Sequence, residues 1–143
     1  MALPDLFPLR PTYREMIWGG RGLEQHLNKD LPPERAIGES WEVSACEGME
    51  STVSEGPFSG WDLRRLVAKH GAELLGEAVC ERYQGEFPLL IKLLDARDDL
   101  SVQVHPDDHY ARDKGLRSFG KMEAWYVLHS DNGRIVYGLE EGV

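Results

Sequence analysis

The sequence predicts a protein built mainly of β-strands, an antiparallel sandwich or small barrel with a short helical insertion. Three observations carry this prediction. Short runs of alternating apolar and polar residues recur along the chain, turn-forming residues separate them, and helical periodicity is confined to two short stretches. The 143 residues suffice for one compact domain with its own core, so we expect a single domain.

The first 60 residues are rich in turn formers, as in WGGRG at 18–22 and LPPER at 31–35. Between such turns, SWEVSA at 40–45 alternates as a short strand does. The pattern then becomes helical, because Leu63, Leu66, Val67 and His70 are spaced so that they fall on one face of a helix. We expect a helix over 61–70 that ends at Gly71, followed by a shorter helical piece, so that the insertion covers about 61–82.

The last third of the chain returns to strand periodicity. We expect strands at 88–96, 100–105, 123–130 and 134–139. Asn132-Gly133 between the last two is a strong hairpin signal. Pro106 suits the first turn of a helix and the two aspartates after it complement the helix dipole, which predicts a helix over 106–114.

Composition narrows the possible functions. The chain has 16 Lys and Arg against 25 Asp and Glu, a formal charge of -9, which argues against binding to nucleic acid or to an anionic membrane surface. No window approaches the roughly 20 apolar residues of a membrane span. The two cysteines, Cys46 and Cys80, form no CxxC motif and fit a reducing compartment. We therefore expect a cytoplasmic protein.

The segment at 100–105 holds the strongest candidate for a site. On a strand, Ser101, Gln103 and His105 project from one face and Val102 and Val104 from the other. Together with Glu123, 18 residues after His105, the face offers an imidazole, a carboxylate and an amide oxygen, a mixed donor set suited to zinc or a similar divalent ion. The alternative is an ordinary polar strand face.

Two lysines accompany this donor set. Lys121 lies two residues before Glu123, so the two side chains share a face if the strand begins that early. Lys92 lies within LLIKLL, whose aliphatic residues predict a buried strand, and a buried lysine is costly without a partner. Its amine either lines a pocket or extends to water at a sheet edge.

These residues carry a family resemblance. PLLIKLLDARDDLSVQVHPDDHYARDKG at 88–115 and GKMEAWYVL at 120–128 resemble the core motif of the type I mannose-6-phosphate isomerases, metal-dependent enzymes of the cupin superfamily. MIWGG at 16–20, IGESWEVSA at 37–45 and EGPFSG at 55–60 resemble the short bacterial branch of that family in the same order. The resemblance covers nearly the whole chain.

The resemblance implies a fold and a metal site. Gln103, His105 and Glu123 match three metal ligands of the family, whose fourth ligand is a later histidine. His109 and His129 lie at the wrong positions for that ligand, one in the predicted helix and one beside the hairpin turn. Family members are longer and close their barrel with later strands. We therefore expect residues 1–143 to form a truncated N-terminal domain with an incomplete cupin-like fold.

The resemblance also implies an activity, the zinc-dependent or other divalent-metal-dependent interconversion of mannose 6-phosphate and fructose 6-phosphate through an enediol. Lys121 would act as a catalytic residue, and Lys92 and Ser101 would contact the sugar phosphate. Trp18 would line the site or belong to the core. The alternative function is a non-catalytic cupin-type module that binds a sugar or a metal. A homodimer is one way for two such chains to complete a barrel.

Overall fold

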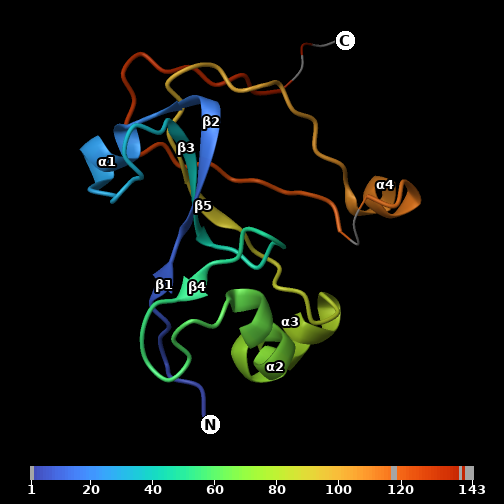
Figure 1. The fold of residues 1–143 in the computed structure, drawn as a ribbon. Coiled ribbons are helices and arrows are strands. Elements are labelled where there is room, and N and C mark those ends of the chain that lie inside the picture. Colours follow the sequence, from blue (N-terminus) through green and yellow to red (C-terminus); the bar gives the residue numbers. More distant parts are fainter. Residues whose placement is uncertain (1, 117–118, 139, 141–143) are drawn as a thin grey trace. The chain divides into compact units, whose positions relative to one another are not determined.

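The computed structural model describes residues 2–116, 119–138 and 140 (Figure 1). The chain forms two compact units, Met1–Asp99 and Leu100–Val143. The single domain expected from the length of the chain stays a prediction.

The first unit contains two antiparallel sheets. The larger sheet has the order β2 (Thr12–Gly20), β3 (Ile37–Val43) and β5 (Ile91–Leu94). The smaller sheet pairs β1 (Leu9–Arg10) with β4 (Thr52–Val53). These strands confirm the antiparallel architecture. β3 overlaps the predicted stretch 40–45 but begins three residues earlier, and β5 lies within the predicted stretch 88–96 but is shorter than expected. A closed sandwich or barrel stays a prediction.

Two glycines allow β2 and β3 to approach closely. A Cβ atom on Gly19 would collide with the backbone of Gly38, and one on Gly38 would lie 2.6 Å from both the Met16 side chain and the Trp18 ring. Only glycine leaves room for a backbone or a large ring at such positions. The indole of Trp18 is buried at this contact, with 9% of the residue exposed.

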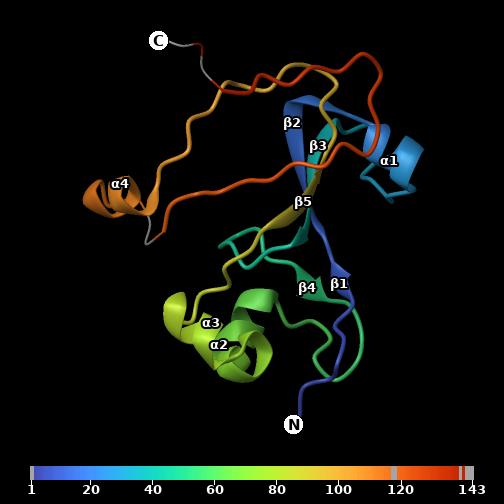
Figure 2. The same ribbon diagram turned by 180° about the vertical axis from the view of Figure 1, so that it is seen from behind.

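The predicted helical insertion is confirmed as α2 (Leu63–Leu75) and α3 (Glu77–Arg82). Asp62 caps α2 by accepting a hydrogen bond from the Arg65 N–H at 2.6 Å. The helix bends at His70, beside the expected end at Gly71, but continues to a cap at Gly76, where φ is 82° and glycine is favoured. Figures 1 and 2 both show α2 and α3 near the β1–β4 pair.

Each end of the first unit has its own apolar core. The larger core joins α2 to the small sheet through Val53, Phe58, Leu63, Leu66 and Val67. The smaller core packs α1 (Gly22–Leu27) on the three-stranded sheet through Leu23, Leu31 and Ile37. α1 was not among the predicted helices; it has about one and a half turns, and its first N–H, that of Gly22, donates to the Asp95 carboxylate at 2.6 Å.

In the second unit, the predicted helix over 106–114 is confirmed as α4 (Asp108–Asp113). Asp107 is its N-cap and accepts a hydrogen bond from the Tyr110 N–H at 2.7 Å. Pro106 therefore precedes the cap instead of occupying the first helical turn.

The strands predicted at 100–105 and 123–130 are wrong for this structure, and so is the strand at 134–139 over its described residues, 134–138. Val102 and Val104, the expected apolar side of the first strand, are 86% and 93% exposed. The physical reason is that alternation describes only the side chains, whereas a strand also needs a neighbour to pair its N–H and C=O groups. None of these described segments pairs with another in a ladder.

The predicted hairpin at Asn132-Gly133 is wrong in the same way, although the chain does turn there. Asn132 adopts a left-handed conformation with φ of 54°, and the Gly133 N–H donates to the Ser130 hydroxyl at 3.0 Å. The turn residues behave as expected, but the flanking residues do not pair. Residue 139, the last of the predicted strand, lies outside the described residues.

Within the part of the chain that the structure describes, no helix has both the length and the apolar character needed to cross a lipid bilayer.

Candidate metal centre and substrate contacts

Three predicted site residues meet in the second unit. His105 Nε2 lies 2.7 Å from Glu123 Oε2, and Lys121 Nζ lies 2.7 Å from Glu123 Oε1. Each of the three side chains is about a quarter exposed, at 24%, 25% and 27% for His105, Glu123 and Lys121. The structure thus brings together an imidazole, a carboxylate and an ammonium that lie up to 18 positions apart in the sequence.

Backbone contacts between the two motifs explain this meeting. The Lys121 N–H donates to the Pro106 carbonyl at 3.0 Å, and the Gly120 N–H donates to the Asp108 carboxylate at 2.7 Å. A Cβ atom on Gly120 would lie 2.5 Å from the Pro106 oxygen, so the glycine is required for this approach. The segment that carries Glu123 is therefore held against the residues that follow His105.

The Glu123 carboxyl is strongly acidic in this setting. Burial alone would raise its pKa, but hydrogen bonds from Lys121 and His105, and their charges, lower the pKa to about 2. A carboxylate that stays ionised at neutral pH is the form that a divalent cation binds. The chemistry of Glu123 therefore fits the role of a metal ligand.

Gln103 and Ser101 contact each other in the same unit. The Gln103 Nε2 donates to the Ser101 hydroxyl at 3.5 Å, a long contact. Because the amide nitrogen is used there, the Gln103 oxygen is the atom that would serve as a ligand. The ligand role predicted for Gln103 and the substrate contact predicted for Ser101 stay predictions.

The donor set fits a divalent ion in its chemistry, with one imidazole nitrogen beside one carboxylate and an amide two residues before the histidine. Among residues 2–116, 119–138 and 140, no three side chains of His, Cys, Asp or Glu gather as a metal-binding group. His109 pairs with Asp113 at 3.2 Å along α4, with 80% of its side chain exposed. The described residues thus supply His105 and Glu123 as the core of the candidate site.

Lys92 has a partner that the sequence analysis missed. Its Nζ lies 3.1 Å from Glu39 Oε1, on the neighbouring strand β3, and its side chain is 21% exposed. Glu39 is buried, with 6% of the residue exposed. The signal was available, because a glutamate within the alternating GESWEV stretch can neutralise a lysine within the apolar LLIKLL stretch.

Trp18 lies in the core of the first unit. Its ring packs against Gly38, and its carbonyl accepts hydrogen bonds from the backbone of Arg97 at 3.0 Å and Asp98 at 3.2 Å. These contacts tie the end of β2 to the segment after β5. Of the two alternatives predicted for Trp18, the structure shows the core position, and its contact with a substrate stays a prediction.

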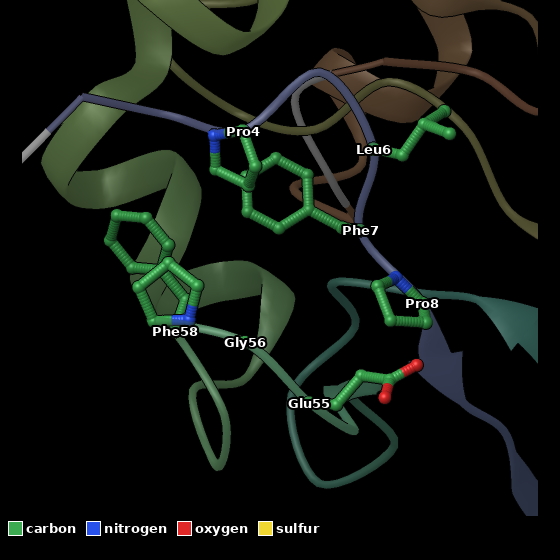
Figure 3. A pocket seen from close by; sticks show the side chains of 8 residues that line it. Pro4, Leu6, Phe7, Pro8, Glu55, Gly56 and Phe58 are labelled. Atoms are coloured by element: carbon green, nitrogen blue, oxygen red, sulfur yellow. The ribbon is translucent and has the colours of Figure 1, made fainter.

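A small pocket lies elsewhere in the first unit, between residues 4–8 and 55–58 (Figure 3). Its volume is about 190 Å³, and its walls are mostly proline and aromatic side chains, with the Phe7 and Phe58 rings tilted by 58° at 5.9 Å between centroids. Small-molecule sites usually exceed about 300 Å³ and carry convergent polar groups. None of the predicted site residues lines this pocket.

Comparison with known proteins assigns the chain to a family. The profile of "Phosphomannose isomerase type I, catalytic domain" matches residues 6–137. The mannose-6-phosphate isomerase of Streptococcus mutans is 42% identical over 133 residues, which are 92% of this chain and 40% of the relative. The chain thus spans about two fifths of the length of this relative.

Solved structures agree with this result. The mannose 6-phosphate isomerase from Bacillus subtilis superposes with a TM-score of 0.63 at 37% identity, over 78% of this chain and 34% of the other. A variant of the phosphomannose isomerase from Salmonella typhimurium gives a TM-score of 0.70 at 26% identity, over 79% of this chain and 29% of the other.

The first unit is built on antiparallel sheets, and the second unit places a histidine beside a glutamate, two side-chain types that bind divalent metal ions. The matched profile makes the class specific. The chain belongs to the type I phosphomannose isomerase family.

Proposed function

We propose that the protein is a metal-dependent isomerase that interconverts mannose 6-phosphate and fructose 6-phosphate. The observation that carries the proposal is the meeting of His105, Lys121 and Glu123 within a segment matched by the family profile. In this reaction a proton moves between C2 and C1 of the sugar while the carbonyl moves from C1 to C2. The reaction is therefore redox-neutral overall and needs no external oxidant or reductant.

The metal ligands in this proposal are Gln103, His105 and Glu123. A bound divalent ion, for which we propose zinc, would act as a Lewis acid on a substrate oxygen. With Glu123 as the single anionic ligand among the three, the centre keeps a net positive charge. The amide of Gln103 would orient the site without reducing that charge, whereas a second carboxylate would.

Lys121 is the residue we propose for proton transfer. Its ammonium already donates to Glu123 at 2.7 Å, so the carboxylate fixes its position. An ammonium at this position can donate a proton or a hydrogen bond to a sugar oxygen as negative charge develops on it. The base that removes the carbon-bound proton is not assigned.

We propose that Lys92 and Ser101 contact the sugar phosphate and that Trp18 supports the site. An ammonium and a hydroxyl are both suitable donors to phosphate oxygens. They would provide local positive charge and polarity within a chain of formal charge -9. We also propose a cytoplasmic location and a cupin-type barrel for the whole protein, with a homodimer as one way to complete it.

The test is a coupled assay of mannose 6-phosphate conversion with the full product of the gene. Removal of metal with a chelator should abolish turnover, and added zinc should restore it, because the substrate oxygen then regains its Lewis acid. Conversion that is unaffected by the chelator would overturn the metal-dependent mechanism.

The second candidate function is a non-catalytic module that binds a sugar or a metal. It is favoured by the observation that, among the described residues, no third side chain of the His, Cys, Asp or Glu type joins His105 and Glu123 as a metal-binding group. This function predicts zinc binding without any turnover at saturating zinc, so the same assay separates the two.

A further inference from the structure

A row of charged and aromatic side chains crosses the three-stranded sheet of the first unit. Arg14 on β2 is opposite Glu39 on β3, and Trp41, two residues further on β3, is opposite Lys92 on β5. Residues two apart on a strand share a face, and directly opposed residues do so as well. The four side chains therefore form one group on one face, the Arg14 cluster, made of Arg14, Glu39, Trp41 and Lys92.

Glu39 is the centre of the Arg14 cluster, and its two carboxylate oxygens accept hydrogen bonds from different donors. Oε2 accepts hydrogen bonds from the Trp41 indole at 2.7 Å and from Arg14 Nη1 at 3.1 Å. Oε1 accepts from Lys92 Nζ at 3.1 Å. With one oxygen fixed by two donors, the other oxygen has a defined direction, and that direction sets where the Lys92 ammonium lies.

Trp41 adds a second constraint on both cations. The Arg14 guanidinium carbon lies 5.4 Å from the centroid of the indole, and Lys92 Nζ lies 5.8 Å from it. Cations within about 6 Å of an aromatic centroid are attracted to the ring. The Lys92 ammonium therefore contacts the Glu39 carboxylate and the Trp41 ring, and Arg14 contacts the same two groups.

The charges of the Arg14 cluster do not cancel. Two cations share one carboxylate, so one positive charge is in excess in a chain that is acidic overall. Without Arg14, the remaining Lys92–Glu39 pair would be neutral. The guanidinium thus affects both the position of the Lys92 ammonium and its ability to attract an anion.

We propose that Arg14 is a positioning residue, which acts through Glu39 and Trp41 to hold the Lys92 ammonium in place for an anionic group of the ligand. The anionic group rests on the proposed function, in which Lys92 contacts the sugar phosphate. The positioning itself rests only on the contacts of the Arg14 cluster and is tested separately.

The first measurement is the rate at which the Lys92 ammonium hydrogens exchange with water, followed by NMR in the full product of the gene and assigned by loss of the signal in Lys92→Met. Arg14→Gln is the main variant, because the Arg14 side chain is 42% exposed and its loss leaves no cavity. We expect exchange to accelerate about threefold in Arg14→Gln and about tenfold in Glu39→Gln, with partial rescue in Arg14→Lys.

The matched control is Arg35→Gln. The Arg35 side chain lies 4.0 Å from that of Glu15, and both side chains are exposed. The Lys92 exchange rate in this variant should equal that of the wild type. A rate in Arg14→Gln that also equals the wild-type rate would overturn the proposal. Removing the Arg14 charge alone would slow exchange, because a nearby positive charge disfavours the protonated form of an amine. Faster exchange in Arg14→Gln would therefore report weaker contacts of the Lys92 ammonium with Glu39 and Trp41.

The second measurement is the kinetics with mannose 6-phosphate. In Arg14→Gln we expect KM to rise about threefold with kcat unchanged, because a ground-state contact is weakened. Faster exchange with unchanged KM would uphold the positioning and overturn the substrate contact proposed for Lys92. If the wild type has no turnover, the proposed function fails while the exchange rates still decide the positioning.

Discussion

The backbone N–H of Lys121 donates to the carbonyl of Pro106 at 3.0 Å, and this bond connects the two motifs of the candidate metal centre. It joins the residue after His105 to the residue two before Glu123. The His105 and Glu123 side chains, which make contact at 2.7 Å, are therefore positioned by main-chain structure and not by their mutual attraction alone. Side chains held in this way lose less freedom when a ligand binds, which would favour the metal binding proposed above.

Asp108 supports this connection and gives the first prediction. Its carboxylate accepts the Gly120 N–H at 2.7 Å, so Asp108→Asn should loosen the segment that carries Glu123. We expect zinc affinity to fall about tenfold, as is usual when a residue that orients a ligand is lost. Asp113→Asn, which changes an exposed partner of His109 in the same helix, is the control. Isothermal titration with zinc that gave equal affinities for the two variants would contradict the prediction.

The core under α2 gives the second prediction. Leu66 is completely buried among Val53, Phe58, Leu63 and Val67, so Leu66→Ala should lower the free energy of unfolding by about 2 to 5 kcal/mol. Leu89→Ala, at a position that is 60% exposed, should change it by less than about 0.5 kcal/mol. Urea unfolding measures both values. Similar losses in the two variants would mean that the larger core does not stabilise the first unit.

The buried carboxylate of Glu39 gives the third prediction. Burial by itself raises the pKa of Glu39, but hydrogen bonds from Trp41 and Lys92 and the charges of Lys92 and Arg14 lower the pKa below its usual value. A lowered pKa contributes stability above the pKa of the unfolded chain, and this contribution is lost as the pH falls through the lowered value. Stability of the wild type should therefore fall more steeply than that of Glu39→Gln as the pH drops below about 5, where an ordinary glutamate begins to be protonated.

Urea unfolding across this pH range provides the measurement for Glu39. Glu47→Gln is the control, because the side chain of Glu47 is 84% exposed, although it lies 3.3 Å from Arg64. The control should follow the wild-type curve. If the curve of Glu39→Gln ran parallel to that of the wild type, the ionised form of Glu39 would not contribute to stability.

The sequence predicted those parts of the fold that depend on local signals. The helical insertion follows from apolar residues at helical spacing, and α4 follows from Pro106 and the two aspartates after it, whose charge complements the helix dipole. The predicted strands after residue 100 failed because strand formation depends on a partner that alternation does not specify. Exposed Val102 and Val104 have the side-chain pattern of a strand without its hydrogen bonds.

Some residues of the candidate site could likewise be predicted from the sequence, and others could not. Motif spacing left an ordinary polar face as an alternative, and the family resemblance brought His105, Lys121 and Glu123 forward as a group; the structure places them in contact. The role of Arg14 could not be predicted, because it depends on the register that sets Arg14 opposite Glu39 across two strands. A shift of register by one residue would move Arg14 to the other face of the sheet.

The central claim is that His105 binds a metal ion on which turnover depends. The most direct test compares the zinc content and turnover of His105→Ala with those of His109→Ala. Zinc is measured by elemental analysis of the purified full-length product of the gene, and turnover by conversion of mannose 6-phosphate. We predict that His105→Ala loses both bound zinc and turnover, whereas His109→Ala, whose side chain is 80% exposed on α4, keeps both. Full zinc content and wild-type turnover in a folded His105→Ala protein would contradict the account.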